Sequence, residues 1–319
     1  MIYFISSLIF FLDFEYCGNI EFVAGSNKGF KDGKDAMFNS PHGLCIDFEG
    51  NIIVADTNNH KIRKITNGIV STIAGNEKGF QDGKNAKFHY PNGICIDHEG
   101  NIIVADTGNN KIRKIRNGIV YTIAGTSSGF KDGNKAKLNS PYGVCVDNEG
   151  TIIVSDTYNN KIRIIKNGIV STMTQLCSEF VHILYPYGIC IDNNKNIIIT
   201  DSGNHTIKKI FDKETYYSIS LITGDSSIPG FLDGSITNAL FDNPFGICLD
   251  HEENIIIADT HNNKIRKIKN GIVSTIAGSQ KGLHDGIIFN QPTGICVDYE
   301  GNIIVSSTEN HKIIKIVTK

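Results

Sequence analysis

Residues 41–75 read PHGLCIDFEGNIIVADTNNHKIRKITNGIVSTIAG, and residues 91–125 repeat this stretch with seven changes. Four further copies follow in the 319-residue chain, and a proline opens each copy. These prolines are Pro41, Pro91, Pro141, Pro186, Pro244 and Pro292, at spacings of 50, 50, 45, 58 and 48 residues. A period near 50 residues is typical of a propeller or a solenoid.

Each copy divides into four short strands separated by turn residues. In the first copy we expect strands at residues 43–47, 52–55, 61–65 and 69–74, the last two joined by an Asn-Gly hairpin turn. No stretch of ten residues has helical periodicity, which argues against a strand–helix repeat. Four strands joined by tight turns form one twisted antiparallel sheet, which is a propeller blade. The sequence therefore predicts an all-β, six-bladed β-propeller with four-stranded antiparallel blades.

The two ends of the repeat region predict how the ring closes. The sixth copy has strands at residues 294–298, 302–306 and 312–316, and then the chain stops without a fourth strand. Residues 18–25, GNIEFVAG, resemble the fourth strand of the second copy, GIVYTIAG at 118–125. We expect residues 20–24 to pair with residues 312–316, because this removes the free edges that a solenoid would leave. Residues 18–319 then form one propeller domain.

The first 17 residues are predicted to be an apolar extension of that domain. The run at residues 2–12 is too short to span a bilayer. It lacks the basic region and the small-residue cleavage site of a signal peptide, although a signal peptide, and with it secretion, stays open as an alternative. With 40% hydrophobic residues, 20% charged residues and a net charge of −2, the composition indicates neither a nucleic-acid binder nor a membrane-surface protein.

The phrase ADTNNHKIRKI at residues 55–65 resembles the signature of the NHL-repeat family, with the Asn-His pair at Asn59 and His60. The phrase GF-x-DG at residues 29–33 looks like the variety of repeat found in teneurins and in thioredoxin-linked NHL proteins. The resemblance covers residues 18–317. It implies a platform that binds protein or RNA, since most members are such platforms, while a few relatives are lyases or sugar-lactone hydrolases.

Residues that recur in nearly every copy are expected to serve the fold, because a functional site would be singular. The aspartates at Asp47 and Asp56 and their equivalents precede turns, where a carboxylate accepts backbone N–H groups. Phe30 of the GF-x-DG phrase is expected to fill a gap between blades. The cations of the third strand, Lys61, Arg63 and Lys64 in the first copy, are interpreted as a solvated strand near the rim. The alternative is a set of positive patches that hold phosphate.

Six cysteines share one position of the first strand: Cys45, Cys95, Cys145, Cys190, Cys248 and Cys296. Their spacing does not fit a zinc site, and equivalent positions in neighbouring blades are expected to lie too far apart for disulfides. We interpret them as small buried apolar side chains. Six free thiols favour a reducing compartment, so a cytoplasmic location is expected.

The informative positions vary while their surroundings stay fixed. The residue after each proline is His42, Asn92, Tyr142, Tyr187, Phe245 or Thr293, and Tyr158 and His261 occupy the turn between the second and third strands. Both positions lie at the same end of an antiparallel blade, so we expect them to ring one mouth of the central channel. Aromatic anchors dominate binding interfaces, whereas the alternative is neutral variation at loop tips.

These observations predict a monomeric, non-enzymatic propeller that binds a protein partner at the channel mouth, without a cofactor or metal. A zinc site needs converging ligands, and His42 is the one histidine expected at an inner-strand entrance. One alternative is a metal-dependent lyase or hydrolase, and another is single-stranded RNA binding at the aromatic and basic mouth. The linker at 173–185 lacks the GF-x-DG phrase and carries Cys177 and His182, and its role stays open.

Overall fold

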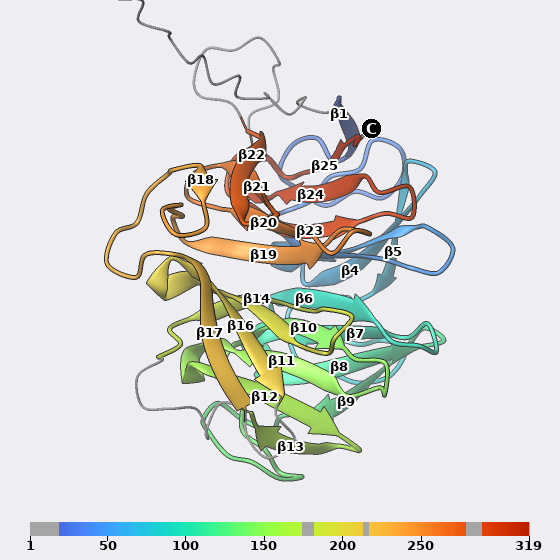
Figure 1. Cartoon of the computed structure of the whole chain (residues 1–319). Helices are drawn as coiled ribbons and strands as arrows, with labels where there is room; N and C mark the ends of the chain where they lie inside the picture. The colour runs from blue at the N-terminus through green and yellow to red at the C-terminus, as the bar shows by residue number, and fades with distance from the viewer. Residues whose placement is uncertain (1–18, 174–181, 213–216, 279–288, 319) are drawn as a thin grey trace, which may run out of the picture.

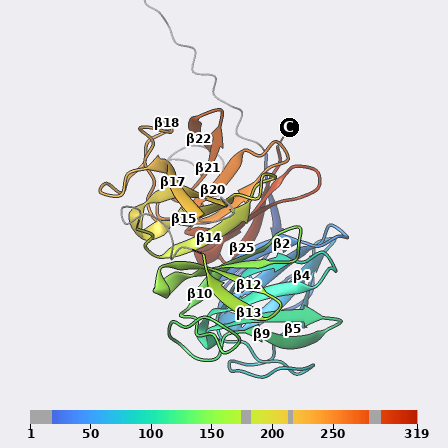
Figure 2. The same cartoon turned by 60° about the horizontal axis from the view of Figure 1, so that its bottom comes forward.

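Six antiparallel sheets form the blades of a propeller in a computed structural model, which describes residues 19–173, 182–212, 217–278 and 289–318 (Figures 1 and 2). Blade 1 contains β2 (Pro41–Ile46), β3 (Ile52–Asp56), β4 (Lys61–Thr66) and β5 (Ile69–Ala74). Blade 2 contains β6 (Pro91–Ile96), β7 (Ile102–Asp106), β8 (Lys111–Arg116) and β9 (Ile119–Ala124). Blade 3 contains β10 (Pro141–Val146), β11 (Ile152–Asp156), β12 (Lys161–Lys166) and β13 (Ile169–Thr172).

The remaining blades follow the same order. Blade 4 contains β14 (Pro186–Ile191), β15 (Ile197–Asp201), β16 (Thr206–Asp212) and β17 (Tyr217–Gly224). Blade 5 contains β19 (Pro244–Leu249), β20 (Ile255–Asp259), β21 (Lys264–Lys269) and β22 (Ile272–Ala277), with β18 (Gly234–Ser235) added at its edge. Blade 6 contains β23 (Pro292–Val297), β24 (Ile303–Ser307), β25 (Lys312–Ile316) and β1 (Ile20–Ala24). The predicted six-bladed architecture is confirmed.

The ring closes as the repeat pattern predicts. β1 pairs antiparallel with β25, with Ile20 opposite Ile316 and Phe22 opposite Ile314. The inner strands contact one another in sequence, and β23 of blade 6 contacts β2 of blade 1. The apolar extension at residues 1–17 lies outside the described residues. Within the described part of the chain, no helix is long and apolar enough to cross a membrane.

Apolar residues on both faces of the sheets pack one blade against the next. Between blades 1 and 2, Ile53 and Ile62 pack with Phe88, Ile94 and Val104 in one buried cluster. Strands that are covered on both faces read as nearly continuous apolar runs, which explains the Ile-Ile-Val or Ile-Ile-Ile phrase of each second strand. The first strand begins at the proline rather than at the following glycine. Proline fits this first position because it lacks the N–H that a residue inside a sheet would need to donate.

The third strand differs from the sequence interpretation. It lies inside each blade, with β4 between β3 and β5, and the Arg63 side chain is fully buried instead of solvated. Its Nη1 lies 2.5 Å from Oδ2 of Asp56, and its Nη2 lies 2.6 Å from Oδ1 of Asp32 in the GF-x-DG phrase. Arg63 thus forms two ion pairs that tie the linker to the blade.

Phe30 does not fill a gap between blades, so that expectation is also wrong. Its ring is half exposed and lies 4.9 Å from the Arg63 guanidinium, which it covers from outside. Phe38 is the fully buried aromatic and lies 5.1 Å from the same guanidinium. Arg63 is therefore held by two carboxylates and two aromatic rings. Equivalent buried arginines with the same pairing are Arg113, Arg163 and Arg266.

The turn aspartates do what their sequence positions predict. Oδ1 of Asp47 accepts N–H groups from Glu49 and Asn51, at 3.0 and 2.8 Å. Asp56 accepts the Asn39 N–H at 2.8 Å while it pairs with Arg63. These carboxylates stabilise the fold.

Candidate channel-mouth site

The first strands of all six blades line a cavity on the propeller axis. It encloses about 290 Å³ and is surrounded by the glycines, cysteines and β-branched residues of these strands. The glycines let the strands approach closely, since a Cβ added at Gly143 would lie 2.2 Å from the carbonyl oxygen of Tyr187 in the next blade. The axis of the propeller is therefore narrow, and it offers a small apolar space.

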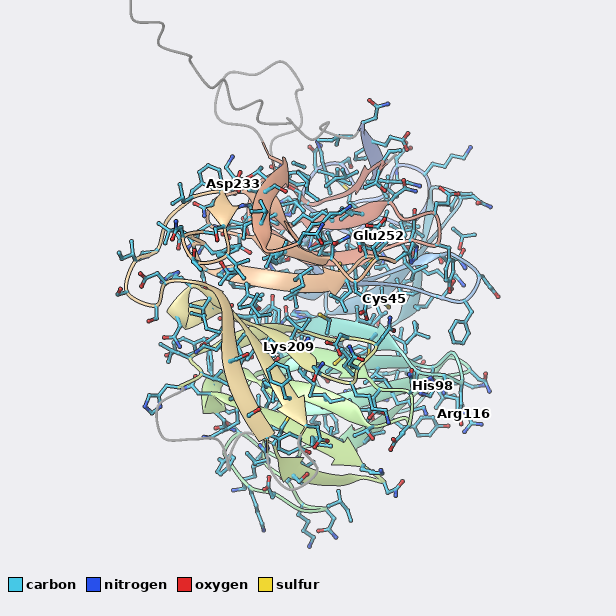
Figure 3. The ribbon with its side chains drawn as sticks, viewed as in Figure 1. Cys45, His98, Arg116, Lys209, Asp233 and Glu252 are labelled. Carbon is cyan, nitrogen blue, oxygen red and sulfur yellow. The ribbon has the colours of Figure 1, made fainter. Side chains whose placement is uncertain are left out.

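The six repeated cysteines face this cavity. All of them line it, and each is partly buried and free of disulfide bonds. Figure 3 shows Cys45 near the middle of the molecule and Arg116 at its rim. Burial raises the pKa of the Cys45 thiol well above its ordinary value, so the thiol is protonated at neutral pH. In the described ranges no three His, Cys, Asp or Glu side chains are grouped so that they could hold a metal ion.

Four large side chains from four blades meet at one end of the cavity. The rings of Tyr187 and Phe245 are stacked with centroids 4.0 Å apart, and Tyr142 packs edge-on against Tyr187 at 4.7 Å. His42 reaches Tyr142 across blade 2, with ring centroids 5.8 Å apart. We call His42, Tyr142, Tyr187 and Phe245 the mouth cluster. We expected the variable residues to ring the mouth, and these four of them pack against one another there.

Burial fixes the charge of the mouth cluster. It lowers the pKa of His42 to about 4, so the imidazole is neutral at physiological pH. Burial also raises the pKa of Tyr187 to about 12 and that of Tyr142 well above its ordinary value. A hydrogen bond joins Nδ1 of His42 to the Tyr142 hydroxyl. The mouth cluster is thus an uncharged group of rings in which His42 and Tyr142 bond to each other.

The aromatic surface continues from the mouth cluster onto neighbouring turns of blades 3 and 4. Tyr158 is 56% exposed and packs edge-on against Tyr185, with ring centroids 5.8 Å apart. Together with Asn139 and Tyr187, these two side chains line a surface pocket of about 380 Å³. The sequence comparison missed Tyr185, which directly precedes Pro186 and has a positive φ of 49°. A tyrosine, Tyr90, also precedes the proline of the second copy, and this recurrence was the signal in the sequence that could have identified Tyr185.

The other predicted mouth residues do not join this surface. Asn92 and Thr293 are buried, and they bond to the hydroxyls of Thr107 and Thr308 at 2.9 and 2.6 Å. Thr293 still lines the axial cavity. His261 is half exposed beside Asp242, at 3.5 Å, with its other ring nitrogen 3.1 Å from the Asn243 amide. The candidate site therefore narrows to blades 3, 4 and 5, with His42 as its contribution from blade 1.

Comparison with known proteins places this geometry in a family. The model of the NHL repeat matches residues 38–65, 88–115, 138–165, 184–210 and 289–316. No functionally curated protein matches the sequence.

Several solved structures share the fold at low sequence identity. An auxiliary nutrient binding protein from Bacteroides thetaiotaomicron is 16% identical, with a TM-score of 0.73 over 93% of this chain and 76% of that one. Virginiamycin B lyase from Staphylococcus aureus is 16% identical, with a TM-score of 0.60 over 91% and 98% of the two chains. A gluconolactonase from Xanthomonas campestris is 10% identical, with a TM-score of 0.64 over 92% and 86%. Binding proteins and enzymes thus share this architecture. Because five NHL repeats match the sequence and six blades form the ring, the chain is an NHL-repeat β-propeller.

Proposed function

We propose that this propeller is a non-enzymatic binding protein that engages a protein partner through the channel mouth on blades 3 to 5. The observation that carries the proposal is the continuous aromatic surface from the mouth cluster to Tyr158 and Tyr185. Tyrosine and phenylalanine supply large contact areas at little cost in side-chain entropy, and such residues dominate binding energies at protein interfaces.

The shape and charge of the mouth favour a protein over the other candidates. The rings of the mouth cluster pack against one another, and the exposed aromatic side chains beside them, Tyr158 and Tyr185, line a surface pocket, which favours a broad contact over a buried small substrate. Single-stranded RNA would need cations beside the aromatic rings. Of the third-strand cations that suggested such a surface, Arg63 pairs with Asp56 and Lys64 with Asp47, whereas Lys61 donates to the Gly75 carbonyl oxygen. The six unpaired thiols support a reducing, cytoplasmic setting.

Site-specific photocrosslinking tests the proposal. We expect p-benzoylphenylalanine in place of Tyr158 to capture a protein in cells, because this side chain is exposed on the aromatic surface. The control places the same group at Tyr299, which is 63% exposed in the turn at the opposite end of the blades. Equal yields of the same adducts at both positions, or none at Tyr158, would contradict the proposal. Stoichiometric zinc or calcium in the purified protein would favour a metal-dependent lyase or hydrolase instead.

A further inference from the structure

A second kind of ion pair recurs at the end of the blades opposite the channel mouth. A lysine of the third strand pairs with the aspartate that follows the first strand, as Lys64 does with Asp47 at 2.8 Å. In five blades the distance lies between 2.6 and 3.1 Å. An asparagine such as Asn51 donates its amide to both oxygens of the same carboxylate. We call this group the turn clamp, and Figure 3 labels its lysine in blade 4, Lys209.

Blade 3 lacks both donors of the turn clamp. Ile164 stands where the other blades have lysine, and Thr151 stands where they have asparagine. Oδ1 of Asp147 keeps the backbone N–H bonds from Glu149 and Thr151, at 2.9 and 2.8 Å. Among the described residues, no lysine or arginine nitrogen lies within 4.0 Å of Asp147, in contrast to its five counterparts.

The missing side chains leave a pocket between blades 3 and 4, which we call the interblade pocket. It encloses about 350 Å³, and Asp147, Thr151 and Ile164 line it. Its remaining walls mix polar side chains with the buried apolar residues Ile153, Met173, Ile197 and Ile210. The pocket therefore combines a carboxylate with a buried apolar wall.

Charged side chains of both signs border the interblade pocket. Its described lining contains Asp147, Glu149 and Asp212 against Lys166 and Lys195. Both lysines engage Glu149, with Nζ to carboxylate distances of 3.4 Å for Lys166 and 2.8 Å for Lys195. They thus form exposed ion pairs at the rim. Asp147 lines the same pocket, and it lacks the lysine ammonium that its counterparts bind in the other five blades.

We propose that the interblade pocket binds a primary ammonium group carried on an unbranched aliphatic stem, as in a lysine side chain or a free alkylamine. The ammonium group takes the place beside Asp147 that lysine holds in the other five blades. The methylene stem packs against Ile153 and Ile164, since an amphipathic cation buries its stem while its charged end meets the carboxylate. This site lies away from the channel mouth and does not depend on the function proposed for that surface.

Binding of n-butylammonium to the full chain, followed by NMR or calorimetry, tests the proposal. We expect saturable binding at millimolar concentration, in keeping with a ligand of five heavy atoms. Asp147→Asn keeps the shape of the turn and removes the charge, so it should weaken binding at least tenfold. Its matched control is Asp97→Asn in blade 2, where Lys114 already occupies the carboxylate at 2.8 Å, and this variant should bind like the wild type.

Restoring the turn clamp in blade 3 provides a second test of the same site. The Thr151→Asn, Ile164→Lys variant should fill the site with its own ammonium, lose n-butylammonium binding and melt at a higher temperature than the wild type. Ile164→Leu, which stays apolar, should retain binding. Comparison of n-butylammonium with Nα-acetyl-lysine methylamide distinguishes a free amine from a lysine side chain as the occupant. Unchanged binding in Asp147→Asn, equal binding of n-butanol, or no binding to the wild type would overturn the proposal.

Discussion

Arg113→Ile is expected to destabilise the propeller by about 3–5 kcal/mol, because it leaves a buried carboxylate without its cation. Asp106 has no exposed side-chain surface, and Nη1 of Arg113 lies 2.5 Å from its Oδ2. Burial raises the pKa of Asp106 even with its hydrogen bonds to His89 and Asn109 in place. Asp82, the second partner of Arg113, is 44% exposed, and water can solvate it after the substitution.

Blade 6 provides the control for this substitution, since it replaces both partners together. Ser307 stands in the position of Asp106, and Ile314 stands in that of Arg113. The Asp106→Ser, Arg113→Ile variant should therefore recover most of the stability lost by Arg113→Ile alone. Denaturant titration of the three proteins measures the free energies of unfolding. A double variant no more stable than the single variant would show that the buried pair does not act as a unit.

Removal of residues 1–25 is expected to cause aggregation and a lower melting temperature. The deletion takes away β1 and exposes the hydrogen-bonding edge of β25, including the backbone opposite Ile20 and Phe22. An unpaired edge strand is a template for pairing with another chain. Removal of residues 1–18 alone leaves β1 in place and serves as the control.

Size-exclusion chromatography and thermal melting compare the two deletions. The longer deletion should elute as large species, whereas the shorter one should remain monomeric with the melting temperature of the full chain. A protein without residues 1–25 that stays monomeric and melts unchanged would refute the closure of the ring by β1.

The repeat made the architecture predictable because the same pattern of strands and turns occurs six times in the sequence. Prolines that recur every 45 to 58 residues, the Asn-Gly turn and the strand sequence at residues 20–24 predict blades, turns and closure without knowledge of any contact. The burial of Arg63 could not be read in the same way. It depends on Asp32, which lies 31 residues earlier in the linker, and on the rings of Phe30 and Phe38.

The candidate site could be predicted only in part. The variable positions led to Tyr142, Tyr187 and Phe245, which the structure brings together. They also led to Asn92, which turns inward to the Thr107 hydroxyl, because a varying residue can serve a local hydrogen bond as well as a surface. The interblade pocket follows from a lysine and an asparagine that are missing, and their importance appears only once the turn clamp of the other blades is seen.

The affinity of the partner captured at position 158 tests the central claim, that the aromatic surface on blades 3 to 5 carries the binding energy. We expect Tyr158→Ala with Tyr185→Ala to raise the Kd at least tenfold without a change in melting temperature, since both side chains are exposed. The control pair, Tyr90→Ala with Tyr121→Ala, removes two exposed tyrosines of blade 2 and should leave the Kd within twofold of the wild-type value. An unchanged Kd in the first pair, or equal losses in both, would contradict the claim.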